Sequence, residues 1–194
     1  MKDFFLKNAL EVSHLVMQKE LQKGSVAIDA TCGKGNDTLF LVDLLGETGR
    51  VFAFDIQSEA IKLTREKLIQ HNCLKNVELI QDSHENMDYY INELVDGVMF
   101  NLGYLPGINS NLITLPKSTL IAVDKALTML KLGGILTMVF YPGHEGGQAE
   151  LDKVKDYLVN LSQKEFEVSQ LNFINQINNP PQLIVVKKLR RGNK

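Results

Sequence analysis

The stretch of sequence that decides the fold reads Val26-Ala27-Ile28-Asp29-Ala30-Thr31-Cys32-Gly33-Lys34-Gly35-Asn36-Asp37-Thr38. A short apolar run passes into a glycine-containing turn, and a helical pattern begins at about Asp37. A parallel strand leads into a crossover helix in this way. Because the same change from apolar run to helical pattern recurs along the chain, this stretch is the first unit of an α/β fold.

The rest of the chain continues this alternation. The apolar runs that predict strands cover 26–28, 51–54, 77–80, 97–100 and 135–140, and Gly133-Gly134 is expected to break the chain before the last of them. The patterns that predict helices cover about 4–22 (apolar stripe Phe5, Ala9, Val12 and Val16), 37–45, 58–71, 85–94, 117–131 and 147–161. Two last strands, about 166–173 and 183–189, have no helix between them and should form an antiparallel hairpin. We expect a single doubly wound α/β domain over 1–194, with the helix of 1–23 packed on it.

Composition excludes several classes of protein. The 194 residues are 44% hydrophobic and 23% charged, with a net charge of -2, which argues against a disordered, collagen-like or disulfide-stapled chain. The two cysteines, Cys32 and Cys73, form no Cys-x-x-Cys pair, so we expect a cytoplasmic protein. No stretch approaches the roughly 18 apolar residues of a membrane span. No Cys/His spacing suits zinc, so we expect no metal site.

Glycines in the first turn predict a ligand site. Gly33 and Gly35 let the backbone approach a ligand closely, and the next helix offers free N–H groups. The turn is neither Gly-x-Gly-x-x-Gly nor a Walker loop, which weakens a dinucleotide interpretation.

Acidic residues follow the next two strands. Asp55, supplemented by Gln57, could accept hydrogen bonds from ribose hydroxyls. Asp82, in the segment Gln81-Asp82-Ser83-His84, could accept one from an adenine amino group. Each carboxylate could instead cap the helix that follows it. Three strand-end carboxylates in order, with Asp29 the first, favour a nucleoside-binding edge.

This combination resembles the class I S-adenosylmethionine-dependent methyltransferases over most of the chain. The resemblance implies a Rossmann-like domain with a seven-stranded, mostly parallel sheet and helices on both faces. It implies S-adenosylmethionine as cofactor, bound by Asp29, Thr31, Gly33, Gly35, Asn36, Asp37, Asp55, Gln57, Asp82, Ser83, His84 and Asn101. One departure is Thr31, which stands where the common pattern has its first glycine and could offer its hydroxyl to the ligand.

The fourth strand leads into a candidate acceptor loop, Phe100-Asn101-Leu102-Gly103-Tyr104-Leu105-Pro106-Gly107. It is similar to the Asn-Pro-Pro-Tyr signature of amino-group methyltransferases. An Asn carbonyl can orient an amine by accepting its hydrogens, and a Tyr ring can stack on a nucleobase. The alternative is a loop that uses Asn, Gly and Pro as turn residues.

A second cluster, Tyr141-Pro142-Gly143-His144-Glu145-Gly146-Gly147, follows the fifth strand. His144 could accept a proton, since imidazole titrates near neutrality. Its alternative is a solvent-facing histidine of a loop.

With these segments the resemblance narrows to the YtqB-like group, the MnmM-type tRNA methyltransferases. Four motifs carry it in order, beginning at Asp29, Asn101, Tyr141 and Asn175. That group methylates the amine of 5-aminomethyl-2-thiouridine at the wobble position, which implies the anticodon stem-loop of tRNA as partner. It also implies Asn101, Tyr104 and His144 as catalytic residues and Leu102, Gly103, Tyr104, Pro106, Tyr141 and His144 as substrate-binding residues. After Gly107 this chain has Ile108-Asn109-Ser110, a departure that predicts different acceptor contacts.

The attacking amine has to be neutral. A primary alkylamine has a pKa of roughly 10 and is mostly protonated in solution, so we expect His144 or Asp82 to help neutralise it. Phosphate contacts could come from the basic end of the chain, Lys187, Lys188, Arg190, Arg191 and Lys194, or that end could simply be solvated. The turn 175–181 could approach the acceptor site or a second subunit of a homodimer.

Three other functions are compatible with parts of the pattern. The acceptor loop alone also permits a methyltransferase acting on rRNA or on a protein amide. A nicotinamide-dependent oxidoreductase would need the third glycine of the Gly-x-Gly-x-x-Gly fingerprint, which this sequence lacks. A non-catalytic RNA-binding module would not need the acidic residues of the strand ends.

Overall fold

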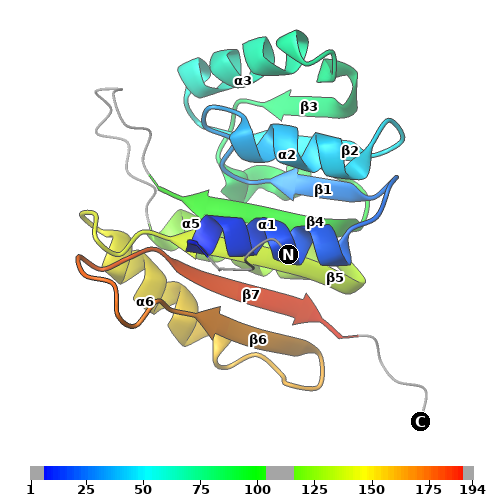
Figure 1. The fold of residues 1–194 in the computed structure, drawn as a ribbon. Helices are drawn as coiled ribbons and strands as arrows, with labels where there is room; N and C mark the ends of the chain where they lie inside the picture. The colour runs from blue at the N-terminus through cyan, green and yellow to red at the C-terminus, as the bar shows by residue number, and fades with distance from the viewer. Residues whose placement is uncertain (1–6, 104–115, 190–194) are drawn as a thin grey trace, which may run out of the picture.

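In a computed structural model that describes residues 7–103 and 116–189, seven strands form one sheet in the order β3-β2-β1-β4-β5-β7-β6 (Figure 1). The strands are β1 (Val26–Asp29), β2 (Arg50–Phe54), β3 (Val77–Ile80), β4 (Val95–Leu102), β5 (Leu130–Phe140), β6 (Phe166–Leu171) and β7 (Gln182–Lys188). Strands β1 to β5 pair in parallel, while β7 lies antiparallel between β5 and β6. The expected parallel sheet with a reversed terminal hairpin is confirmed.

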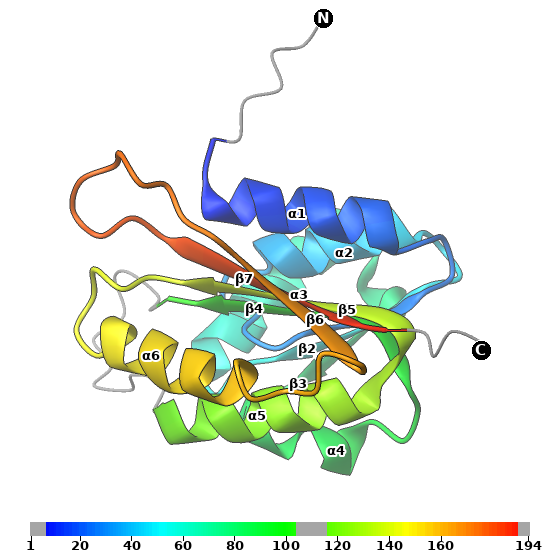
Figure 2. The ribbon, with the colours of Figure 1, turned by 90° about the horizontal axis from the view of Figure 1, so that it is seen from below.

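Helices cover both faces of the sheet. They are α1 (Ala9–Glu20), α2 (Asn36–Leu45), α3 (Ser58–Gln70), α4 (Met87–Tyr90), α5 (Pro116–Met129) and α6 (Gly147–Leu158), with single 3-10 turns η1 (Leu74–Asn76) and η2 (His84–Asn86). Figures 1 and 2 show α1, α2 and α3 on one face and α4, α5 and α6 on the other. None of these helices within the described residues is long and apolar enough to cross a membrane.

The central strands are buried on both sides because two apolar layers sandwich them, whereas β6 at the edge is largely exposed. Neighbouring residues of β4 show the division: Met99 packs with Met17 of α1 and Leu41 of α2, whereas Phe100 packs in the layer that contains Ala126 of α5. Side chains alternate between the faces of a strand, so a run of consecutive apolar residues fills both layers.

Helix α1 begins where Asn8 caps it. The Asn8 side chain accepts a hydrogen bond from the Glu11 N–H at 2.8 Å, which satisfies one of the free donors of the first turn. The predicted helix start near residue 4 is therefore wrong, and Phe5 lies outside the described residues. In the structure this helix packs on the sheet, where Ala9 and Val12 lie against Val139 and Leu183.

Two other predicted boundaries are wrong. The helix expected over 85–94 is a 3-10 turn followed by the single turn α4, because Ile91 adopts an extended conformation and is buried. The Gly133-Gly134 pair does not precede β5 but lies inside it. Gly133, at φ +83°, accompanies an irregularity in the pairing of β4 with β5, so the strand starts at Leu130.

The register aligns the polar residues that follow the strands. Asp29 pairs with Ala53 and Met99, and Asn101 pairs with Val139. Asp55, Asn101 and Tyr141 therefore lie at or just beyond the carboxyl ends of neighbouring strands, where open α/β sheets bind ligands.

Candidate functional site

Asp29, the last residue of β1, holds the turn that follows this strand through hydrogen bonds. Its side chain is 1% exposed, and its oxygens accept hydrogen bonds from the Thr38 hydroxyl at 2.6 Å and the Thr31 N–H at 3.2 Å. Burial, reinforced by the nearby Asp37 carboxylate, raises the pKa of Asp29 to about 7. The structure thus places Asp29 beneath the turn, whereas the other acidic residues stand closer to the surface.

The glycine turn packs tightly against α3. Gly35 has φ +73°, and a Cβ there would lie 3.0 Å from atoms of Thr64. The Thr64 hydroxyl donates to the Gly33 carbonyl at 3.0 Å. Only a residue without a side chain fits this position in this conformation.

Asp55 ties the turn to the end of β2. Its carboxylate accepts the Gly33 N–H at 3.0 Å and the Gln57 N–H at 2.9 Å. Burial raises the pKa of Asp55, although these hydrogen bonds act in the opposite direction. The backbone of the turn and the carboxylate predicted to hold a ribose are therefore directly connected.

Asp82 lies in a polar cluster after β3. It accepts hydrogen bonds from the Tyr90 hydroxyl at 2.8 Å, the Asn86 amide at 3.0 Å and the Ser83 N–H at 2.7 Å. Burial disfavours the charged form, but the hydrogen bonds outweigh it and lower the pKa of Asp82. Ser83 also caps η2 by accepting the Glu85 N–H.

Two buried polar atoms at this edge have no hydrogen-bond partner within the described part of the chain. They are Oε1 of Gln57 and Nε2 of His84. Nδ1 of His84 lies 3.2 Å from the Ala30 carbonyl oxygen, and burial lowers the pKa of this histidine. Since buried polar groups normally have partners, both atoms are suited to meet polar groups of a nucleoside.

Asn101 is held in place by two hydrogen bonds. Its backbone N–H donates to the Thr31 hydroxyl oxygen at 2.7 Å, and its side-chain Nδ2 donates to Oδ2 of Asp37 at 2.9 Å. Thr31 thus uses its hydroxyl to join the β1 turn to β4. Because the amide nitrogen is engaged with Asp37, the Asn101 carbonyl oxygen is left to accept other hydrogens.

Asp37 contacts Asn101, and His14 in turn contacts Asp37. Asp37 is 5% exposed, and its Oδ1 lies 2.7 Å from Nε2 of His14 in α1. The His14 ring stacks on Phe40 with a centroid distance of 3.9 Å. Nothing in the sequence marks His14, because a histidine on an amphipathic helix carries no motif, and its role follows only from the docking of α1.

Tyr141 lies beside Asn101 and Gly103, at the start of the candidate acceptor loop. Burial and the Asp37 carboxylate raise the pKa of Tyr141, whereas a hydrogen bond with Asn101 lowers it. A Cβ at Gly103 would lie 3.4 Å from the Tyr141 ring, and the His144 ring lies 6.0 Å away between centroids. The Leu102 side chain is buried in the core, so only the backbone of Leu102 could make the substrate contact expected of this residue.

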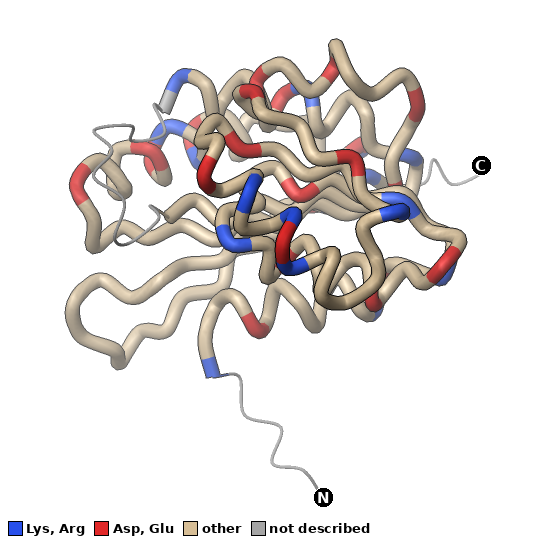
Figure 3. Tube along the Cα trace, turned by 90° about the horizontal axis from the view of Figure 1, so that it is seen from above, with Lys and Arg blue, Asp and Glu red and all other residues tan. Residues whose placement is uncertain are grey.

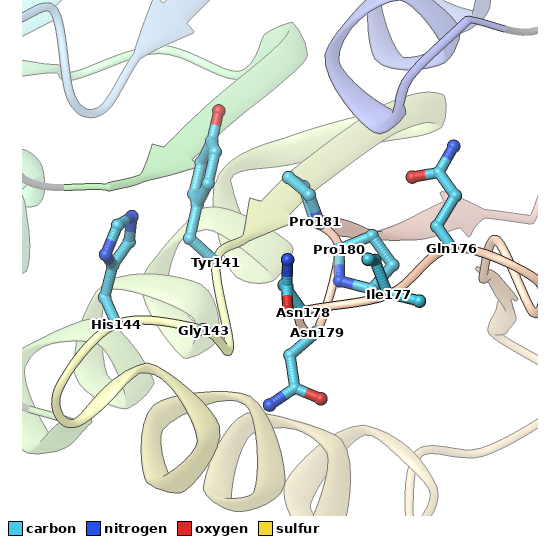
Figure 4. A pocket seen from close by; sticks show the side chains of 9 residues that line it. All are labelled: Tyr141, Gly143, His144, Gln176, Ile177, Asn178, Asn179, Pro180 and Pro181. Atoms are coloured by element: carbon cyan, nitrogen blue, oxygen red, sulfur yellow. The ribbon is translucent and has the colours of Figure 1, made fainter.

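A pocket of about 350 Å³ opens beside Tyr141. Tyr141, Gly143 and His144 line one side, and residues 176–181 of the β6–β7 loop line the other (Figure 4). The expected approach of this loop to the acceptor end is confirmed. A Cβ at Gly143 would lie only 3.2 Å from the Asn178 carbonyl oxygen, so the two loops are closely packed.

Three predicted site residues remain. Tyr104 and Pro106 fall outside the described residues. Asn36 is exposed and receives a hydrogen bond from Lys67 of α3.

The basic end is partly engaged within the protein. Lys187 pairs with Glu20, and Lys188 donates to backbone carbonyls such as that of Leu127. Arg190, Arg191 and Lys194 lie outside the described residues. Within residues 7–103 and 116–189, no group of three or more His, Cys, Asp or Glu side chains could hold a metal ion.

Comparisons with known proteins agree with this geometry. The family model described as "Putative rRNA methylase" matches residues 51–187. The chain is 38% identical to the chloroplastic tRNA (mnm(5)s(2)U34)-methyltransferase of Arabidopsis thaliana, over 98% of this chain and 72% of that one. The structure described as a putative rRNA-methylase from Clostridium thermocellum superposes with a TM-score of 0.93 at 46% identity, covering 96% of this chain and all of the other. A putative methyltransferase of Streptococcus mutans, solved in complex with SAH, gives 0.87 at 43%, covering 95% and 100%.

Proposed function

The chain belongs to the methyltransferase family described as "Putative rRNA methylase", and from this premise we propose that it methylates the amine of 5-aminomethyl-2-thiouridine at position 34 of tRNA. The main observation behind the proposal is that the buried carboxylate of Asp37 orients the side chain of Asn101, which lies near the end of β4. The 38% identity to a tRNA (mnm(5)s(2)U34)-methyltransferase supports the choice of substrate.

The carboxyl edge of the sheet fits S-adenosylmethionine, the cofactor of this family. The turn has no room for a side chain at Gly35, and the carboxylates of Asp55 and Asp82 can accept hydrogen bonds from ribose hydroxyls and from an adenine amino group. The partnerless atoms of Gln57 and His84 lie at the same edge. When bound, the cofactor supplies a methyl group on a positively charged sulfonium.

Asn101 orients the amine. Its Nδ2 donates to Asp37, which fixes the amide so that the carbonyl oxygen accepts a hydrogen of the acceptor amine. Asp37 is itself fixed by His14, and the Asn101 backbone is fixed by Thr31. A nucleophile held in one orientation reacts faster because less motional freedom is lost on the way to the transition state.

Of the two residues expected to help neutralise the amine, Asp82 and His144, the strand order favours one. Strands β3 and β4 are separated by β2 and β1, so Asp82 and Asn101 are about 14 Å apart at the usual strand spacing. This separation argues against Asp82 as the residue that neutralises the amine. His144 follows β5, the neighbour of β4, and its ring lies beside Tyr141. We assign proton removal to His144.

The test uses the purified protein with S-adenosylmethionine and tRNA that carries 5-aminomethyl-2-thiouridine. Nucleosides from the digested tRNA are analysed by mass spectrometry. We expect the 5-methylaminomethyl nucleoside to appear. If the protein binds S-adenosylmethionine but leaves this tRNA unmodified, the substrate assignment is wrong, and rRNA and a protein amide become the acceptors to test in the same assay.

Three further expectations stay predictions: a cytoplasmic location, a homodimer and RNA contact by the basic end. Cell fractionation and sedimentation of the purified protein test the first two. Charge reversal at Arg190 and Arg191 tests the third. It should weaken tRNA binding and reduce its dependence on salt.

A further inference from the structure

The pocket beside Tyr141 is electrically neutral apart from His144. Residues 168–186, which include all of the β6–β7 loop, contain no Lys, Arg, Asp or Glu. Figure 3 shows this loop as an uncharged extension of the molecule, while charged residues of both signs are spread over the helices. Phosphate binding depends on cationic groups, so the lining does not suit the RNA backbone.

The walls of the pocket suit a planar heterocycle. The Tyr141 ring stands between His144 on one side and Pro180 and Pro181 on the other (Figure 4). Unstacked bases in RNA loops bind to aromatic side chains and offer their edges to amide and carbonyl groups. Such groups are present here in the side chains of Gln176 and Asn178 and in the backbone of the loop.

The loop holds these groups in a defined conformation. Asn178 and Asn179 have φ values of +64° and +48°, in the left-handed region that asparagine tolerates better than most residues. Close contact with Gly143 fixes the loop against the segment after β5. The polar edge of the pocket is therefore formed before a ligand arrives, which lowers the entropic cost of binding.

Tyr141 connects the pocket to the reacting end of Asn101. Tyr141 follows β5 directly, Asn101 is the second-to-last residue of the neighbouring strand β4, and the two side chains interact. A ring lying against Tyr141 would thus be adjacent to the group that orients the amine.

We propose that this pocket binds the base of the nucleotide to be methylated, with the uracil-type ring against Tyr141 and its polar edge at Asn178. The inference rests on the proposed function and specifies its acceptor site. It requires the target base to leave its stack in the anticodon loop, as bases do in enzymes that modify them.

The first experiment measures steady-state methylation of an anticodon stem-loop RNA that carries 5-aminomethyl-2-thiouridine at position 34. Tyr141→Leu removes the ring and should raise the KM for RNA roughly 10-fold, the usual effect of losing one stacked base. Tyr141→Phe keeps the ring but loses the hydroxyl that interacts with Asn101, so it should lower kcat while raising the KM less than Tyr141→Leu does. Asn178→Gly keeps the backbone conformation, removes the amide and should also raise the KM.

Ile174→Ala is the matched control. Ile174 lies in the same loop and is 96% exposed, but it does not line the pocket, so its KM should not change. Equal S-adenosylmethionine affinity and equal melting temperature across all variants exclude misfolding. An unchanged KM in Tyr141→Leu would overturn the proposal.

The second experiment does not depend on turnover. The same RNA with 4-thiouridine at position 34 is crosslinked by light to the wild-type protein, and the modified peptides are identified by mass spectrometry. Crosslinks within 141–144 or 176–181 support the base pocket, and crosslinks only elsewhere overturn it. If the wild type fails to methylate the first RNA, the proposed function fails, while the crosslink still decides where the position-34 base lies.

Discussion

Asn101 and Asp37 are 64 residues apart in the sequence, yet Nδ2 of Asn101 donates a hydrogen bond to Oδ2 of Asp37 at 2.9 Å. Asn101 is the second-to-last residue of β4 and Asp37 the second residue of α2, and the parallel pairing of β1 with β4 brings them together. The bond fixes the orientation of the Asn101 amide. The candidate site therefore combines several elements, because the orientation of Asn101 in β4 depends on a buried carboxylate of α2.

Replacing Asn101 with Ala should abolish the orientation of the amine while leaving the cofactor edge intact. We expect kcat to fall by about 100-fold, the order of loss seen when a reacting group is misplaced, with an unchanged S-adenosylmethionine affinity. Single-turnover methylation and calorimetric titration measure the two quantities. A small change in kcat would remove Asn101 from the mechanism.

His14→Ala should destabilise the protein and slow the reaction, because Asp37 stays buried and loses a partner. The free energy of unfolding should fall by roughly 1–3 kcal/mol, as measured by urea denaturation. His14→Gln should restore part of both properties, since its amide can donate to Asp37. His71→Ala is the control: His71 is exposed just after α3, and its Nδ1 lies 2.9 Å from the Lys67 carbonyl oxygen, so no comparable loss is expected. A kcat unchanged in His14→Ala would mean that His14 has no positioning role.

Gly35→Ala should weaken cofactor binding. The alanine would be strained at φ +73° and would press on Thr64, at a cost of roughly 1–2 kcal/mol or more. Gly46→Ala introduces strain at φ +69° and ψ −170°, a conformation almost confined to glycine, but its Cβ would meet only the flexible Lys23 side chain, at the other end of α2 from the turn. Both variants should lose stability, and only Gly35→Ala should lose S-adenosylmethionine affinity. Equal affinities would exclude the turn from the cofactor site.

Glu150 should make the protein less stable as the pH rises. Burial raises the pKa of Glu150 to about 7 against a hydrogen bond from Thr119. Between pH 4.5 and 7 the folded protein keeps this proton while the unfolded chain releases it, so the free energy of unfolding falls with pH and levels off above 7. Asp29, with a pKa of about 7, acts in the same direction.

The test compares urea denaturation at pH 5 and pH 8. Glu150→Gln cannot ionise and should lose less stability than the wild type over this interval, by about 3 kcal/mol. Gln148→Ala, an exposed and non-titrating change on the same helix, is the control. Parallel pH profiles for Glu150→Gln and the wild type would contradict the assignment.

The order of apolar runs and helical patterns was enough to predict the α/β architecture, including the reversed pairing of β6 with β7. Local signals failed where tertiary contacts overrode them. Gly133 reads as a chain break but is accommodated in an irregularity of β5, and the pattern over 85–94 reads as a longer helix than α4. In both places, pairing with β4 or burial of Ile91 determines the backbone.

By itself, the sequence determined which residues end the strands, because apolar runs followed by Gly, Asp and Asn are local features. The candidate residues Asp55, Asp82 and Asn101 could be chosen on that basis. Only the tertiary structure decided which of them act together. Strand order separates Asp82 from Asn101, the docking of α1 adds His14, and the packing of two loops forms the pocket at Tyr141. These relationships depend on distances across the sheet, and no spacing along the chain encodes them.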